Sequence, residues 1–592
     1  MNSNLDAYIS DGTPERVRER YRRLSDLAKE SDFGDLDENV VVIDTETTGF
    51  SFNHDELTQI AAARMEHGEV VDWYVTFVNP GKSIPDDVAH LTNIHDEDVA
   101  DAPSPDEALA GLVKFAGDAK IVAHNAEFDR TFTTRHPSGY PLLDNIWIDS
   151  LDLARIALPR MRSHRLIDLV KAFGAPTSTH RADDDVAATC ALFRILLAAV
   201  HEMPPALVKC IALLASVEQW NTAVVFQYFA QPKAKSFSLK ELRHESMTSY
   251  ERKPRIDAKM VQSMEYPTAE DIAQAFSPTG IVGKLYGDFE PREEQLTMAQ
   301  EVRAAFEASE NLVVEAGTGV GKSMAYLVPA VLMAKTNNIA IGVATKTNAL
   351  LDQLVYHELP ALAQSLGDIT YAPLKGFSHY PCLRKVNRFV KEGVKMVDVQ
   401  GTKQSQAPSL GALLSFIDQT DYDDMDSLKM DYRVVPRRAV TTTSHDCLRR
   451  KCPFYGTTCF VHGARRFAET ADVVVTNHTL LFCDAAADNG LLPPVRHWIL
   501  DEAHGAEAEA RRAFSLEIAA EDVVRLAQKV ASGESRNVYA RAEKKLSSSL
   551  KNDGATLFEG LVGKAKSAGD MFAAAAHEFV PHIKDLLYFD PK

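Results

Sequence analysis

Carboxylates follow apolar, strand-like runs in the N-terminal part of the sequence. Asp44 and Glu46 come directly after the run "VVVI", which begins at Val40. Because residues i and i+2 of a strand point to the same face, these two side chains converge. Two carboxylates on one face repel each other unless a positive charge lies between them. The pair therefore indicates a metal site, although a solvated strand end would also explain it.

Two further stretches repeat this pattern. "IVAHNAEFDR" places Asn125 and Asp129 after an apolar strand, and "THRADDDVAAT" places His180 and Asp185 at the start of a long helical pattern. Four acids from separate segments can hold two Mg²⁺ or Mn²⁺ ions, because such ions favour oxygen ligands. Two ions about 4 Å apart activate a water and stabilise the leaving oxygen of a phosphodiester. His180 can take the proton of the attacking water, since its pKa lies near the working pH.

A second kind of chemistry is indicated by "NLVVEAGTGVGKSMAYLVPA", which reads as a strand, a glycine-rich loop and a helix. Backbone N–H groups and a helix N-terminus suit phosphate oxygens. Lys322 would reach the β- and γ-phosphates of ATP, and Ser323 would bind its Mg²⁺. The nucleotide-binding loop is predicted to consist of Ala316, Gly317, Thr318, Gly319, Val320, Gly321, Lys322 and Ser323.

Two motifs would complete the nucleotide site. In "HWILDEAHG", Asp501 at a strand end would hold Mg²⁺ through water, and Glu502 would polarise the attacking water. In "FEPREEQ", Arg292 and Gln295 could recognise adenine. "DEAH" alone could be an exposed turn, but its position after an apolar run and downstream of a phosphate loop favours the nucleotide site.

Four cysteines lie between these motifs, and the last three have the spacing C-x4-C-x6-C. Structural zinc sites usually contain C-x2-C pairs, which are missing here. The wider spacing favours an iron–sulfur cluster, with zinc or free thiols as alternatives. The ligands would be Cys382, Cys447, Cys452 and Cys459. Aromatic side chains that could stack bases, and cations that could follow a nucleic-acid backbone, cluster nearby: Phe377, Tyr380, Arg384, Lys385, Arg449, Arg450, Lys451, Phe454 and Tyr455.

Alternating strand and helix patterns must position these residues, which predicts a multidomain α/β protein. Expected strands are 40–46, 57–65, 70–78, 119–124, 311–315, 339–344, 472–476 and 497–500. Expected helices are 105–117, 151–157, 165–173 and 182–202. The predicted divisions are a helical lead-in (1–36), a first α/β domain (37–202), a connector (203–285), a second α/β domain (286–504) with a cysteine-bearing insertion at about 375–465, and a helical segment (505–592).

The bulk properties of the 592-residue chain are those of a globular protein, with 45% hydrophobic and 25% charged residues. It has no run of about 18 uncharged apolar residues and no signal-peptide pattern, which predicts a cytoplasmic protein without a membrane partner. Seven cysteines then favour metal ligation over disulfides. The net charge of −19 argues weakly against nucleic acid, because metal-binding acids contribute to it and a local basic groove can coexist with it.

The motifs "DTETTG", "HNAEFD" and "HRADDD" make residues 38–202 resemble a DnaQ-like, DEDDh-type 3′–5′ exonuclease domain. The resemblance implies an RNase H-like fold. It implies metal ligation by Asp44, Glu46, Asp129 and Asp185, with His180 as the general base. It also implies that Thr47 and Thr48 line the pocket for the 3′-terminal nucleotide, while Asp183 and Asp184 are solvated.

The phosphate loop, "DEAH", the cysteines and "ADVVVTNHTLL" resemble the first motor domain of a superfamily 2 helicase of the DinG/XPD kind. This resemblance implies a RecA-like domain that binds Mg-ATP, a 4Fe–4S cluster, and the start of a helical arch-like segment. The family continues with a second motor domain, which is expected to be absent here because the sequence ends at "LLYFDPK". A separate chain could supply it.

These observations predict a 3′–5′ exonuclease that acts on single-stranded DNA, fused to half of a motor that does not unwind DNA by itself. Two alternatives remain open. One is an RNA-trimming exonuclease, because the nuclease motifs do not distinguish the two nucleic acids. The other is a nucleic-acid-binding module without catalytic activity that ATP and the cluster regulate.

Overall fold

The computed structural model describes residues 5–176, 181–246, 254–286, 289–317, 319–367, 369–399, 401–444, 446–456, 458–487, 491–515 and 552–586. The chain forms two compact units, Met1–Glu507 and Ala508–Lys592. Each unit is described by itself. Two predicted site residues, His180 and Thr318, lie outside the described residues.

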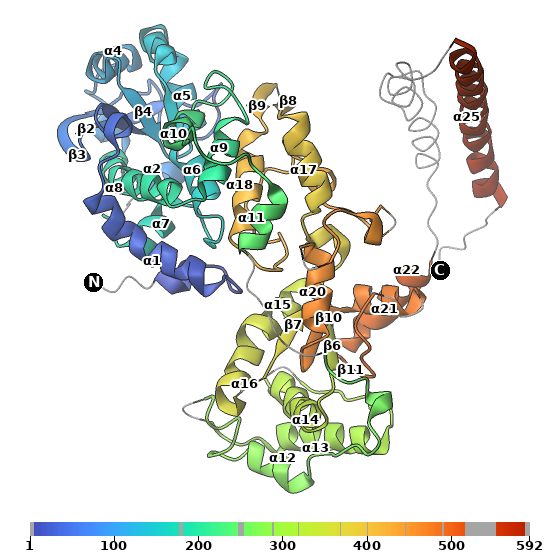
Figure 1. Cartoon of the computed structure of the whole chain (residues 1–592). Coiled ribbons are helices and arrows are strands. Elements are labelled where there is room, and N and C mark those ends of the chain that lie inside the picture. The colour runs from blue at the N-terminus through green and yellow to red at the C-terminus, as the bar shows by residue number, and fades with distance from the viewer. Residues whose placement is uncertain are drawn as a thin grey trace. The chain divides into compact units, whose positions relative to one another are not determined.

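A five-stranded sheet with the order β3-β2-β1-β4-β5 forms the centre of the N-terminal part (Figure 1). β2 pairs antiparallel with β1 and β3, whereas β4 is parallel to β1 and to β5. The strand order and the mixed α/β content agree with the predicted RNase H-like fold, and the four strands predicted here are confirmed. The strands are β1 (Val40–Thr47), β2 (Leu57–Glu66), β3 (Glu69–Phe77), β4 (Lys120–Ala123) and β5 (Trp147–Asp149).

Helices cover both faces of this sheet. Val40 and Val42 of β1 are buried in one apolar cluster, which includes α1 and α8, while Val41 and Ile43 are buried in another, which includes α4 and α5. This alternation is the period of two that a strand imposes on its side chains. The four predicted helices are confirmed. The helices are α1 (Glu15–Glu30), α2 (Asp86–Thr92), α3 (Asp96–Val99), α4 (Pro105–Ala116), α5 (Ala126–Thr134), α6 (Ser150–Ala157), α7 (Leu166–Phe173) and α8 (Ala182–His201).

The predicted lead-in and connector both pack on neighbouring elements. In the lead-in, α1 buries Val17, Tyr21 and Leu24 and packs along α8. The connector begins with α9 (Pro205–Ala212), α10 (Ala223–Phe229) and α11 (Leu239–Ser246). In the described part of the chain no single helix is long and apolar enough to cross a membrane, although the bent pair α8 and α9 passes that test together by length and composition.

A second, four-stranded parallel sheet has the order β11-β6-β10-β7. The predictions at 339–344, 472–476 and 497–500 are confirmed. The strands are β6 (Ile341–Thr345), β7 (Tyr371–Pro373), β10 (Val473–Asn477) and β11 (His497–Leu500), and the helices of this region are α12 (Ala269–Ala275), α13 (Glu293–Ala308), α14 (Lys322–Asn337), α15 (Asn348–Gln353) and α16 (Leu359–Leu366).

The strand predicted at 311–315 is wrong. This segment forms no strand, and Val313 is 94% exposed. An apolar run becomes a strand only where a neighbour accepts its backbone hydrogen bonds. β11 stands at the edge of its sheet and pairs with β6 alone, so the segment that precedes the phosphate loop does not extend the sheet.

The cysteine-bearing insertion lies between β7 and β10 in the chain. Its elements are α17 (Leu383–Glu392), the hairpin strands β8 (Met396–Val399) and β9 (Thr402–Ser405), α18 (Ala407–Asp418), α19 (Arg437–Val440) and α20 (Phe460–Ala468). α21 (His478–Ala486) follows β10, and α22 (Ala506–Phe514) follows β11. In the second unit the described element is α25 (Asn552–Leu586).

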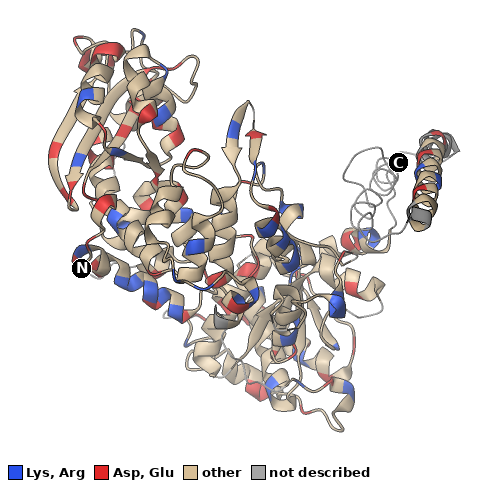
Figure 2. Ribbon diagram, turned by 45° about the horizontal axis from the view of Figure 1, so that its top comes forward, with Lys and Arg blue, Asp and Glu red and all other residues tan. Residues whose placement is uncertain are grey.

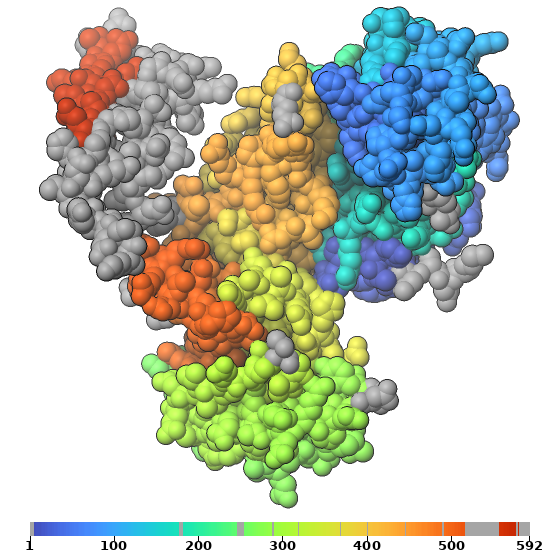
Figure 3. Space-filling model, turned by 180° about the vertical axis from the view of Figure 1, so that it is seen from behind, coloured from blue at the N-terminus to red at the C-terminus, as the bar shows by residue number. Residues whose placement is uncertain are grey.

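α18 joins the insertion to the N-terminal α/β part. It packs against α6, α9 and α11. Gly411 of α18 lies against Ile156 of α6 and Ile211 of α9, where an added Cβ would meet the Ile156 Cδ1 atom at 3.2 Å. One buried apolar cluster therefore runs from the helices of the N-terminal part into the insertion. Figure 3 shows the blue and teal N-terminal part directly against yellow and orange atoms of the insertion. Figure 2 shows acidic and basic residues interspersed along the chain.

Candidate active site

β1 directs Asp44 and Glu46 toward α8. Both residues follow Val40 and Val42 at even spacings along the strand, so their side chains point to the same face of the sheet. α8 covers this face. Asp185 lies in the first turn of α8. One carboxylate oxygen of each of Asp44, Glu46 and Asp185 lies within 4.8 Å of the other two. Three acids predicted from separate stretches therefore meet in one group that could hold a metal ion.

Asp129 approaches the group from α5 on the other side of β1. Its side chain is buried, and its Oδ1 atom accepts a hydrogen bond of 2.8 Å from the Thr45 hydroxyl. Thr45 lies between Asp44 and Glu46 on the strand and points to the opposite face. This hydrogen bond fixes the fourth predicted acid beside the other three.

The electrostatics of this site favour a cation. Burial raises the pKa of Asp44 well above its usual range, and repulsion by Asp129, Glu46 and Asp185 adds to the effect. Burial, with repulsion by Asp185 and Asp129, raises the pKa of Glu46 to about 8. Burial raises the pKa of Asp129 to about 7. Buried like charges disfavour ionisation, so a divalent cation that neutralises them would be held strongly.

The predicted nucleotide-pocket residues Thr47 and Thr48 are buried beside this site, and both hydroxyls make hydrogen bonds. Thr47 donates to the Gly49 carbonyl at 2.6 Å, and Thr48 donates to Asp55 Oδ1 at 3.1 Å. β1 and β2 shift register between Glu46 and Thr47, so the regular ladder ends where the acids are presented. Contact of either threonine with a nucleotide stays a prediction.

A cavity of about 620 Å³ adjoins Asp185. His124, at the end of β4, lines it and is held on both ring nitrogens, at 2.9 Å from the Ser150 hydroxyl and 2.9 Å from the His164 carbonyl. Burial lowers the pKa of His124 below its usual value. The two hydrogen bonds of the His124 ring connect the end of β4 to α6 and to the loop before α7. The ring thereby forms part of the cavity wall.

Two features of this region were missed by the sequence analysis. Arg155, Arg165 and Lys429 line the cavity, and Lys429 comes from the insertion. Exposed aromatic rings also lie close to the acids, because Phe50, which is 83% exposed, packs against Phe128 next to Asp129. The aromatic residue after "DTETTG" was a local signal for the second feature. No local signal connects position 429 with the nuclease motifs.

In the described residues of the phosphate loop the glycine turn and the following helix form, whereas the predicted strand before them does not. Gly319 and Gly321 have φ values of +84° and +83°, which strongly favour glycine. Lys322 begins α14, and its Nζ atom lies 3.5 Å from Glu502 Oε1 and 3.4 Å from the Ala316 carbonyl. A helix N-terminus after a glycine turn is the geometry that an anion site requires.

The residues predicted around the nucleotide are brought together only in part. Asp501 accepts a hydrogen bond of 3.2 Å from the Tyr326 hydroxyl, and Glu502 lies beside Lys322. Arg292 donates to the Gly319 carbonyl, and Gln295 donates to the Gly321 carbonyl at 2.9 Å. Arg292 and Gln295 thus brace the phosphate loop, and adenine recognition by them stays a prediction.

All four predicted cysteines line one cavity in the insertion. Cys382 stands before α17 and Cys459 before α20. Burial raises the pKa of Cys459 to about 11 and also raises that of Cys382, and nearby thiols contribute. Buried thiols that meet in one cavity suit a metal or cluster that stabilises their thiolate form. His462, which the sequence analysis missed, lies 3.7 Å from Cys447 Sγ.

Three of the aromatic residues predicted to stack bases are buried. Phe377, Tyr380 and Phe454 belong to the apolar core of the insertion, so a base cannot reach their faces. They pack around the cysteine cavity instead. Tyr455 remains accessible at 39% exposure. The local clustering of aromatic and basic residues could not distinguish these roles.

Comparisons with known proteins show what the chain is similar to. Residues 41–193 match the family model described as Exonuclease. Over 487 residues the chain is 29% identical to the protein named 3′-5′ exonuclease DinG of Bacillus subtilis, a match that covers 79% of this chain and 50% of the relative. The N-terminal part is therefore an exonuclease domain, and most of the chain is similar to DinG proteins.

Other similar proteins cover smaller parts. A 227-residue match to the ATP-dependent helicase DinG of Mycobacterium tuberculosis is 40% identical and covers 36% of this chain and 34% of the relative. A solved structure of Exonuclease X in complex with 5′ overhanging duplex DNA is 26% identical and covers 27% of this chain and 90% of that chain, with a TM-score of 0.23. The chain spans half or less of the length of these two curated DinG relatives.

Proposed function

We propose that the chain is a 3′–5′ exonuclease that hydrolyses single-stranded DNA at the acidic site on β1. The observation that carries this proposal is the meeting of Asp44, Glu46 and Asp185 within 4.8 Å, with Asp129 fixed beside them. The match of residues 41–193 to the Exonuclease family model supports the same reaction.

In the proposed mechanism the four carboxylates would hold two divalent ions, which would supply an activated water and stabilise the leaving 3′ oxygen. Thr45 keeps Asp129 in place through its hydrogen bond. The walls formed by Thr47 and Thr48 orient the terminal nucleotide. His180 accepts the proton of the attacking water, a role that rests on the sequence pattern because His180 lies outside the described residues.

The proposal is tested with 3′-labelled single-stranded DNA and RNA and Mg²⁺. Asp44→Asn should abolish cleavage, and His180→Ala should lower the rate about 10²–10⁴-fold, the usual contribution of a general base. Asp183→Asn is the matched control, since this side chain is outside the acidic group. Mg²⁺ should raise the melting temperature of the wild type and of the control but not of Asp44→Asn. Full activity in Asp44→Asn would refute the proposed site.

The same assay separates the alternatives. Faster cleavage of RNA than of DNA would favour the RNA-trimming enzyme, and binding without cleavage would favour the non-catalytic module. The acids argue for catalysis, because carboxylates that repel each other at a partly buried site destabilise the fold unless they bind cations. The fusion to a region similar to DinG helicases favours DNA as the substrate.

The second part of the proposal concerns residues 286–504, which we assign as a RecA-like motor domain that binds Mg-ATP. The glycine turn before Lys322 and the proximity of Lys322 to Glu502 support nucleotide binding. We also propose that a second motor domain, on a separate chain or in a longer form of this protein, is needed for unwinding. A role in DNA repair or replication is part of the same proposal.

A 4Fe–4S cluster is proposed for the cysteine cavity. Four thiols from one insertion, walled by apolar and aromatic side chains, support it. Such a cluster, when bound, would tie the starts of α17 and α20 together through Cys382 and Cys459. Zinc remains the alternative, and the nearby His462 would suit zinc as well.

A further inference from the structure

The cavity beside the exonuclease acids has predominantly basic walls. Arg155, Arg162 and Arg165 line it on the exonuclease side, Lys429 lines it from the insertion, and Asp185 is the one carboxylate among its described lining residues. A groove that is positive along its length and opens at a metal site suits the phosphates of a bound strand.

These cations are available for a ligand. Across the described ranges, no carboxylate oxygen lies within 4.0 Å of the charged atoms of Arg155, Arg165 or Lys429, whereas Arg162 pairs with Asp11 at 2.6 Å. The Arg155 Nε atom is buried and has no hydrogen-bond partner there. Burial lowers the pKa of His164 to about 4, and the positive charges of Arg155 and Lys429 contribute. The cavity thus offers an entering anion the positive charges of Arg155 and Lys429, with Asp185 as the carboxylate of its described lining.

The loop that carries Lys429 is held in place by contacts to the exonuclease part. Lys429 belongs to the loop of residues 419–431 that follows α18, which we call the bridging loop. Asp423 in this loop pairs with the buried Arg160 at 2.6 Å. Gln419 donates to the Ala157 carbonyl at 3.0 Å and accepts a hydrogen bond of 2.6 Å from the Tyr21 hydroxyl.

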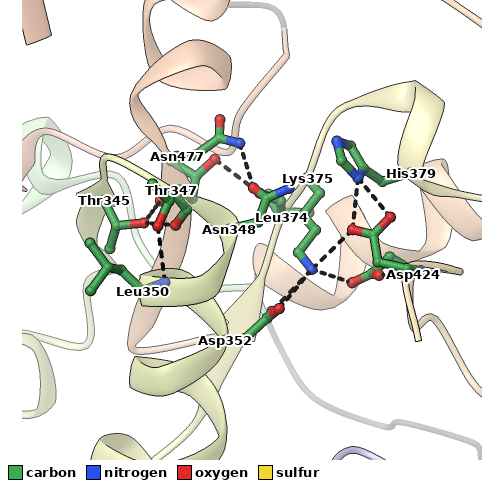
Figure 4. Close-up of polar contacts among 12 residues, drawn as sticks. Thr345, Thr347, Asn348, Leu350, Asp352, Leu374, Lys375, His379, Asp424 and Asn477 are labelled. Atoms are coloured by element: carbon green, nitrogen blue, oxygen red, sulfur yellow. Dashed lines mark hydrogen bonds and ion pairs between the residues drawn. The ribbon is translucent and has the colours of Figure 1, made fainter. Parts of the chain in front are cut away.

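The other side of the bridging loop is fixed beside β7 of the four-stranded sheet, which we call the motor sheet. Lys375, which follows β7 and has a side chain only 1% exposed, lies 2.8 Å from Asp424 and 3.4 Å from Asp426 of the loop. It also lies 3.0 Å from Asp352 of α15 (Figure 4). Burial disfavours the charged amine, but Asp424 and Asp352 outweigh it and raise the pKa of Lys375 above its usual value. Lys375 is therefore a positioning residue that connects α15 to the loop.

We propose that Lys429 contacts the backbone phosphates of single-stranded DNA bound in the exonuclease, so that the insertion completes the substrate groove of the nuclease. This inference rests on the proposed exonuclease function. It assigns to the bridging loop a substrate contact whose position depends on both the exonuclease part and the motor sheet.

The first test measures the affinity of the whole chain for a 20-residue oligothymidylate without divalent ions, at several salt concentrations. Lys429→Ala should weaken binding and make the slope of log K against log salt shallower by about 0.7, the value for one phosphate contact on a single strand. Lys429→Glu should weaken binding about 5- to 10-fold, and Lys429→Arg should restore it. Lys391→Glu is the matched control, because Lys391 is an exposed lysine of the insertion that does not line the groove.

The second test compares substrates of different size in the presence of Mg²⁺. Lys429→Glu should raise KM for the oligonucleotide by a larger factor than KM for the p-nitrophenyl ester of thymidine 5′-phosphate, since the single phosphate of that ester lies at the metal site. Equal affinities and slopes for Lys429→Glu and Lys391→Glu would overturn the inference. A wild type that binds DNA through Lys429 but hydrolyses neither substrate would instead refute the exonuclease proposal and leave the groove in place.

Discussion

At the scale of single residues, burial and charge decide what each site can hold. The exonuclease acids repel each other at their site, and the insertion gathers four thiols in one cavity, where burial opposes ionisation of Cys382 and Cys459. Cys452→Ser should therefore remove the bound iron of an anaerobic preparation, which we expect to contain about four iron and four sulfide per chain. Iron and sulfide analysis with visible absorption measures the effect.

Cys483→Ser is the control for this prediction, because Cys483 lies outside the cysteine cavity. The iron content of this variant should equal that of the wild type. Stoichiometric zinc without iron in the anaerobic wild type would show that the four thiols hold a different metal.

At the scale of elements, α18 and the residue that ends it connect the insertion to the exonuclease. Gln419 is buried and satisfies the Tyr21 hydroxyl and the Ala157 carbonyl at once. Gln419→Leu would remove the acceptor of the Tyr21 hydroxyl and the side-chain donor to the Ala157 carbonyl in the core, so it should lower the free energy of unfolding by about 2–4 kcal/mol. Urea denaturation measures the change.

Two further variants serve as references for the free energy of unfolding measured with urea. Tyr21→Phe removes a single hydroxyl and should cost about 1 kcal/mol. Gln227→Leu changes an exposed glutamine of α10 and should stay within about 0.5 kcal/mol of the wild type. A loss in Gln419→Leu no larger than in Gln227→Leu would mean that α18 contributes little to holding the two parts together.

At the scale of the whole molecule, the phosphate loop and the nuclease groove belong to one connected unit. We expect weak ATP binding, very slow turnover and no unwinding by these 592 residues alone, because a supplied arginine contributes about 10³–10⁵ in rate to other P-loop enzymes. If ATP changes the exonuclease rate or DNA affinity, Lys322→Ala should erase that change and leave basal cleavage intact. Exonuclease assays with and without ATP measure this.

Lys335→Ala is the control for the nucleotide effect, since Lys335 lies in the last turn of the same helix α14 and binds the carbonyl of Gly367 instead of the phosphate loop. Its response to ATP should match that of the wild type. ATP-driven strand separation by the isolated chain would contradict the expectation of an incomplete motor.

The sequence by itself determined the features that depend on neighbours along the chain. The period of two placed Asp44 and Glu46 on one face, and the glycine turn placed Lys322 at the start of a helix. Both are local, because backbone geometry within a few residues fixes them. The chemistry of the two acids and of the phosphate loop could therefore be read before the fold was known.

Only the tertiary structure decided which distant residues meet. It brought Asp44, Glu46 and Asp185 within 4.8 Å of one another, with Asp129 held beside them by Thr45, and it left the run at 311–315 without a partner strand. It buried Phe377 beside the cysteines and brought Lys429 to the wall of the nuclease cavity. Strand pairing, burial and groove lining arise from contacts between residues far apart in the chain, and local periodicity carries no information about those contacts.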